Sequence, residues 1–246
     1  MAKQAKRGSY LDVSGDSLQG FELITASKTL SAASPKQGYV SSPAAAVTVT
    51  LPTTDVKAGF VYKLDVEGAT ETNFVRLNSS GGNEIDRIDG EGFIQVMALQ
   101  DSPTTAAHWR VVNIYVEAVW TPSVDSTLNV TGTPTFSDTS YTRIGNTVFV
   151  RIKSINNCRI TTAGSRFGII INPIGLPKYQ NNSIPCSGAG RAAVTTSPNE
   201  LLPLAISANS SGDDKIFIGV GFVTALGVVS NDLLFLDGIG FSYRID

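Results

Sequence analysis

The sequence has little charge, little cysteine, one histidine and no long apolar run. Only 16% of its 246 residues are Asp, Glu, Lys or Arg, whereas an average soluble domain carries about 25%. The 19 basic and 21 acidic residues leave a net charge of −2. There is thus no basic excess to replace the counterions of a nucleic acid, and we expect no nucleic-acid partner. No apolar run reaches the length of a membrane span, so we also expect no membrane insertion.

Metal and disulfide chemistry has few residues available. Cys158 and Cys186 are too few for a disulfide framework, and we expect both to be buried free thiols. His108 has no Asp or Cys nearby at a metal-ligand spacing, which favours a structural or surface role. The first 30 residues lack the apolar region of a secretory signal, so we expect no cleaved signal. We therefore expect neither a metal nor a cofactor.

The most abundant signal is two-residue alternation interrupted by turn residues. In residues 60–66 and 147–153 every second side chain is apolar, the period of a strand with one buried face. Residues 91–100 are the best helix candidate, although they fit a strand almost as well. Further strands are predicted at 47–51, 74–77, 109–116, 168–171, 216–223, 233–236 and 241–245.

Many short strands separated by Gly-containing turns predict an all-β protein, with two β-sandwich or jelly-roll-like modules. A polar stretch follows Trp120. We therefore place an N-terminal β-module at 21–119 and a C-terminal β-sandwich module at 121–246. Residues 1–20 carry no core pattern and are interpreted as a short N-terminal arm.

The densest group of carboxylates is Glu84, Asp86, Asp89 and Glu91. Calcium favours such oxygen clusters, but the spacing does not match an EF-hand loop. Paired carboxylates also serve glycoside hydrolysis. We favour a solvated hairpin with a turn at 89–90, in which Arg87 balances its neighbours and alternation puts Ile88 on the side of Glu84 and Asp86.

Some aromatic side chains are candidates for stacking on the apolar face of a sugar ring. They are Trp109, Trp120, Tyr141 and Tyr179. Alternation places some of them inward, so core packing is the favoured interpretation.

Two stretches resemble modules of bacteriophage virion proteins. The first consists of residues 24–33 (ITASKTLSAA), 38–40 (GYV), 47–52 (VTVTLP) and 59–64 (GFVYKL). It is similar to a small β-structure that recurs in phage fibres and capsid appendages. The second consists of residues 141–150 (YTRIGNTVFV) and 238–245 (GIGFSYRI). It is similar to the C-terminal domains of phage tail fibres and spikes, in which the first part opens a sheet and the second closes the chain.

The resemblance implies a structural protein of the virion surface with no catalytic residues. A short tail fibre or spike that attaches to the host is the first hypothesis, and a capsid decoration protein (cement or head fibre) is the alternative. Both imply a homotrimer in the virion, in contact with other virion proteins. The N-terminal module would then dock to the virion, and the C-terminal module would project toward the receptor. The low charge agrees, because charged residues are depleted in interface cores. A polysaccharide depolymerase is a further alternative, although the long repeat typical of such spikes is not visible.

In the fibre hypothesis, loops of the C-terminal module bind a host glycan or protein. The choice of residues rests on loop character alone. The expected residues are Tyr179, Gln180, Asn181, Asn182, Asn209, Asp213 and Asp214.

Overall fold

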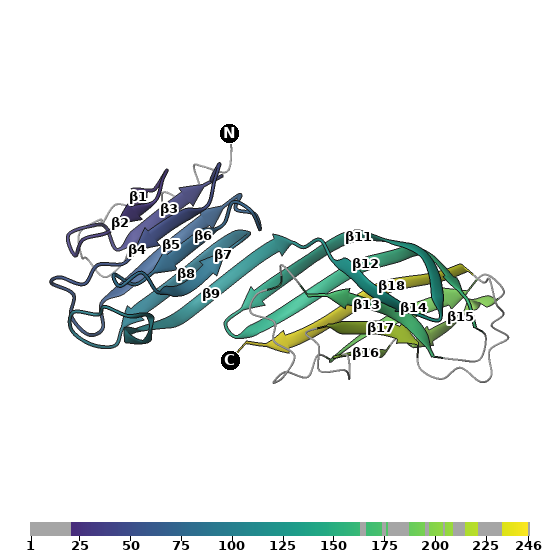
Figure 1. Cartoon of the computed structure of the whole chain (residues 1–246). Helices are drawn as coiled ribbons and strands as arrows, with labels where there is room; N and C mark the ends of the chain where they lie inside the picture. The colour runs from purple at the N-terminus through teal and green to yellow at the C-terminus, as the bar shows by residue number, and fades with distance from the viewer. Residues whose placement is uncertain are drawn as a thin grey trace. The chain divides into compact units, whose positions relative to one another are not determined.

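The structure is a computed structural model that describes most of the chain and is almost entirely β. The described residues are 21–162, 166–173, 176, 187–194, 197–203, 205–208, 215–220 and 233–245. The prediction of an all-β protein is confirmed (Figure 1). The helix candidate at 91–100 forms strand β8 (Glu91–Ala98) instead. Within the described ranges, no helix has the length and hydrophobicity needed to cross a membrane.

The chain divides into two compact units, with the boundary between Asn113 and Ile114. This boundary lies inside strand β9 (Trp109–Val119), and not after it as the sequence suggests. The reason is that residues 115–119 pair with residues 140–144 of a later strand. The second half of β9 therefore belongs to the second unit.

In the first unit the chain passes back and forth between two sheets. One sheet contains β1 (Glu22–Leu23), β3 (Gln37–Ser41), β5 (Val61–Glu67), β8 and the start of β9. The other contains β2 (Lys28–Thr29), β4 (Val47–Thr50), β6 (Val75–Asn78) and β7 (Glu84–Ile88). Strands β1, β3 and β5 are parallel, and so are β2, β4 and β6. The chain thus forms a short coil of parallel strands (Figure 1), which β7 and β8 end with antiparallel pairing.

Successive turns of this coil differ in length. Glu22 lies opposite Gly38, whereas Gln37 lies opposite Lys63. The unequal turns leave no fixed repeat in the sequence. Alternate residues of the strands fill the core, among them Val40, Val47, Val49, Tyr62, Leu64, Val66, Val75, Leu77, Ile94 and Val96.

The second unit is an antiparallel, β-sandwich-like structure. Its strands follow the order β9, β11 (Val130–Ile144), β12 (Thr147–Ile160), β18 (Leu233–Arg244), β14 (Ser187–Val194), β16 (Ala205–Ala208), β17 (Ile216–Val220), β13 (Phe167–Asn172) and β10 (Ser123–Leu128). Strand β15 (Ser197–Pro203) pairs with β14. Strands β10 and β13 also contact β11, so the sheet folds back around a core. That core includes Tyr141, Val148, Val150, Ile152, Ile155, Ile169, Ile171, Ile216, Ile218 and Ile239.

Candidate functional site

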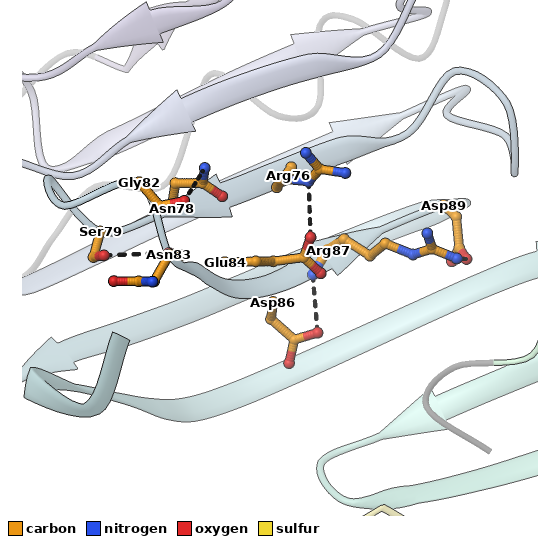
Figure 2. Close-up of polar contacts among 9 residues, drawn as sticks. All are labelled: Arg76, Asn78, Ser79, Gly82, Asn83, Glu84, Asp86, Arg87 and Asp89. Carbon is orange, nitrogen blue, oxygen red and sulfur yellow. Dashed lines mark hydrogen bonds and ion pairs between the residues drawn. The ribbon is translucent and has the colours of Figure 1, made fainter. Parts of the chain in front are cut away.

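The acidic segment lies at the edge of the smaller sheet of the first unit, on β7 and the bend that follows (Figure 2). The predicted alternation holds for Asp86 and Ile88, which are both buried, but it is wrong for Glu84, which is exposed and pairs with Arg76 because the register between β6 and β7 shifts between Glu84 and Asp86. The predicted hairpin is wrong. Strand β7 pairs with β6, whereas β8 pairs with β5 in the other sheet. The bend at 89–90 is therefore a passage between the two sheets.

Glu84, Asp86 and Asp89 each contact a different group, and their carboxyl groups do not point toward a common site (Figure 2). Glu84 Oε2 lies 2.7 Å from Arg76 Nε on the neighbouring strand, as Figure 2 shows. Asp89 Oδ2 lies 3.5 Å from a guanidinium nitrogen of Arg87. Asp86 Oδ1 accepts a hydrogen bond of 2.9 Å from the amide of Arg87. Arg87 thus balances Asp89, as predicted.

Two of these carboxylates are not solvated, contrary to the prediction. Asp86 is 2% exposed and Asp89 is 5% exposed. A buried carboxylate must be paired or hydrogen-bonded, and the contacts with Arg87 meet part of that need. In the described part of the chain, no three His, Cys, Asp or Glu side chains are placed to hold a metal ion. The calcium interpretation therefore finds no ligand set there.

Two arginines and an aromatic ring form a cluster beside these carboxylates. Arg76 and Arg87 are direct partners in the register of β6 and β7. Their guanidinium carbons lie 5.1 and 5.2 Å from the centre of the Phe74 ring. Like charges opposite each other are destabilising, and here Glu84 and Asp89 offset the repulsion. The cluster therefore has a structural explanation.

The candidate sugar-stacking residues lie in the core wherever the structure describes them. Trp109, Trp120 and Tyr141 are 5%, 1% and 2% exposed. An aromatic face covered by protein cannot stack on a sugar, so the preferred interpretation of core packing is confirmed for these three. Tyr179 lies outside the described residues.

His108 stabilises the turn that precedes β9. Its Nδ1 accepts hydrogen bonds from the backbone amides of Thr104 and Thr105, at 3.1 and 3.4 Å. An acceptor nitrogen engaged in this way orients the ring and fixes the loop. This geometry agrees with the structural role predicted for His108.

The expected receptor-binding residues lie outside the described residues, and so does the expected arm at 1–20. Their roles stay predictions. The residues concerned are Tyr179, Gln180, Asn181, Asn182, Asn209, Asp213 and Asp214.

The sequence reasoning missed an apolar surface on the second unit. Val119, Ile144 and Phe149 are 80%, 53% and 48% exposed. A signal was present in the sequence, because Phe149 occupies the position between Val148 and Val150 that alternation assigns to the polar face.

The thiol of Cys158 is expected to be inert in the folded protein. It is fully buried and free, and burial raises its pKa to about 11. About one thiol in a thousand is then ionised at pH 8, and the thiolate is the reactive form. In a Cys186→Ser variant we expect a thiol reagent such as DTNB to label the native protein at least about 100-fold more slowly than free cysteine. Full labelling in guanidinium chloride is the control, and rapid labelling of the native state would contradict the prediction.

Removing the hydroxyl of Tyr62 is expected to stabilise the first unit. The side chain is 1% exposed, and among the described residues its Oη has no hydrogen-bond partner. Burial and the nearby charge of Glu22 raise its pKa. A buried hydroxyl without a partner costs about 1–3 kcal/mol, so Tyr62→Phe should raise the free energy of unfolding by about 1 kcal/mol.

The matched control is Tyr39→Phe in the adjacent strand β3. The Tyr39 hydroxyl donates a hydrogen bond to Glu67 Oε2, so its loss should lower stability. Urea unfolding of both variants measures the difference, and a loss of stability in Tyr62→Phe would show that its hydroxyl is satisfied.

A scan against family models and a search of curated proteins found no match to this chain.

Proposed function

We propose that the chain is a bacteriophage structural protein of the virion surface, of the short tail fibre or spike type. In this proposal it assembles as a homotrimer, contacts other virion proteins and attaches the particle to a host glycan or protein without enzymatic activity.

The observation that carries the proposal is the arrangement of the second stretch that resembles phage tail proteins. Residues 141–150 form the hairpin between β11 and β12, and Gly145 provides the positive φ of its turn. Residues 238–244 lie in β18 and Ile245 follows it directly; β18 pairs with β12 so that Phe149 lies opposite Ser242. The two parts, far apart in sequence, are thus neighbours in one sheet, which agrees with the family pattern.

The first resembling stretch supports the proposal in a second way. Its segments run through the parallel coil from β1 to β5. Many of its larger apolar residues are core positions, namely Ile24, Leu30, Val40, Val47, Val49, Leu51, Tyr62 and Leu64. The stretch therefore supplies much of the core of the coil.

The acidic segment favours a structural role over hydrolysis. A glycosidase needs two carboxyl groups on either side of a sugar bond. Asp86 and Asp89 are buried, and Glu84 is paired with Arg76. We therefore expect no release of reducing ends from host capsular polysaccharide, and release that is lost in Asp86→Asn would favour the depolymerase.

Adsorption of the purified chain to bacterial cells tests the proposal. Labelled protein is incubated with cells of the bacterium that the corresponding phage infects, and bound label is measured against concentration. Saturable binding supports a fibre. Variants Tyr179→Ala and Asn182→Ala then test the expected receptor loops. No binding at micromolar concentration would contradict host attachment and favour the capsid decoration protein. Measuring the release of labelled chain from intact capsids would then test that alternative.

A further inference from the structure

We propose that the outer face of β9, β11, β12 and β18 is the surface through which copies of this chain associate. We call it the outer face; it is formed by the side chains that alternate with the buried ones on these strands and are exposed or half-buried, namely Glu117, Thr142, Ile144, Thr147, Phe149, Arg151, Ser242 and Arg244. This inference rests on the self-association in the proposed function and identifies the surface that mediates it.

The centre of the outer face is apolar. Thr142 lies opposite Phe149, and Ile144 lies opposite Thr147. Ile144 and Phe149 are therefore diagonal neighbours on adjacent strands, within reach of each other. Both are about half exposed, and the side chains between them are threonines. Exposed apolar groups with few charges between them are typical of the core of a protein interface.

The two flanks of the outer face carry opposite charges. Glu117 is exposed on β9, in the same row as Thr142 and Phe149. Arg151 on β12 is exposed in the next row on one side, opposite Gly240, and Arg244 on β18 is exposed in the next row on the other side, opposite Thr147. Among the described residues, neither arginine is within ion-pair distance of a carboxylate, although the charge of Arg151 helps Lys153 to lower the pKa of Asp138 on β11. One flank is thus acidic and the other is basic.

This charge pattern identifies the partner as another copy of the same chain. Rotation about an axis parallel to the strands brings the β9 flank of one copy against the β12–β18 flank of the next. The acidic flank then faces the basic flank at every contact, and closed symmetry buries the apolar centre. A partner of a single charge sign would be repelled by one of the two flanks. Three copies around such an axis place Phe149 and Ile144 at the centre of the trimer.

Light scattering after size exclusion tests the apolar centre with the full chain. The wild-type chain is expected to be a trimer at micromolar concentration. Phe149→Glu should raise the dissociation constant by at least about 30-fold, because a charge at the centre of an interface removes a dominant contact. The matched control is Leu99→Glu, since Leu99 is equally exposed but lies in the first unit, and it should remain a trimer. Unchanged circular dichroism checks that both variants fold.

Charge reversal tests the flanks independently. Glu117→Arg alone, and Arg151→Glu with Arg244→Glu, should each weaken assembly by placing like charges together. The triple variant that reverses both flanks should recover it. Recovery would be direct evidence that the two flanks meet across the interface.

The outcomes separate this surface from the proposed function. If the wild-type chain assembles and neither Phe149→Glu nor the charge reversals weaken assembly, the outer face is the wrong surface and self-association stands. If the wild-type chain is a monomer at the highest concentration reached, self-association itself fails, and this surface fails with it.

Discussion

Replacement of Trp120 by alanine is expected to lower the free energy of unfolding of the second unit by about 3–5 kcal/mol. Trp120 is 1% exposed. Its backbone is held in place because its carbonyl accepts a hydrogen bond from Thr139 Oγ1, and its amide donates to the Thr139 carbonyl. With the backbone anchored, the surroundings cannot collapse into the space that the indole leaves, and the cavity adds to the loss of apolar burial.

Urea unfolding followed by circular dichroism measures this loss. The control is Thr121→Ala, because Thr121 is the exposed neighbour of Trp120 and its change should stay within about 0.5 kcal/mol. A loss below about 1 kcal/mol in Trp120→Ala would show that the indole is loosely packed, contrary to its burial.

Strands with one apolar face were predictable from the sequence, whereas polar strands were not. Residues 147–153 show the alternation that places Val148 and Val150 in the core, and they begin β12. The first half of β11 has hardly any apolar residue, yet it pairs with β12 on both sides of an irregularity at 133–134. Its Ser137 hydroxyl meets the hydroxyl of Ser154 at 2.6 Å. Pairing with a neighbour, and not burial of its own side chains, makes this segment a strand.

The parallel coil of the first unit could not be derived from local pattern. Alternation within 47–50 or 61–67 indicates that one face of each strand is buried, but it does not indicate which other strand pairs with that segment. The partners are distant, since Val47 lies opposite Val75. Only the resemblance to phage modules linked these segments before the structure placed them together.

In the acidic segment, too, alternation predicts which side chains are buried, whereas the pairing between strands is not predictable from the local sequence. The burial of Asp86 beside Ile88 follows from alternation. The pairing of Glu84 with Arg76 depends on the register between β6 and β7, which no local pattern gives. The Asp-Gly pair after β7 is typical of hairpins, and for this reason the change of sheet at that bend was mispredicted.

Replacement of Gly219 by alanine is expected to destabilise the second unit by about 3 kcal/mol. Gly219 on β17 lies opposite Gly168 on β13. A Cβ at Gly219 would lie 2.3 Å from the carbonyl oxygen of Phe167 and 2.4 Å from the Phe217 ring. The carbonyl cannot move without disturbing the pairing of β13 and β17. The ring cannot move freely either, because Phe217 is 2% exposed and the Arg166 guanidinium lies 3.9 Å from its centre.

Gly240→Ala is the matched control for Gly219→Ala. Gly240 lies in β18 of the same unit, and the nearest atom to its added Cβ would be the Val150 carbonyl oxygen at 3.8 Å, an ordinary contact. Both substitutions restrict the unfolded chain by the same amount, an effect worth about 0.4–1 kcal/mol in favour of folding. The difference between the two midpoints of urea unfolding therefore isolates the close approach of the strands at Gly219. Equal stability of the two variants would mean that β13 and β17 can separate to admit a methyl group, and that the ring of Phe217 does not fix their spacing.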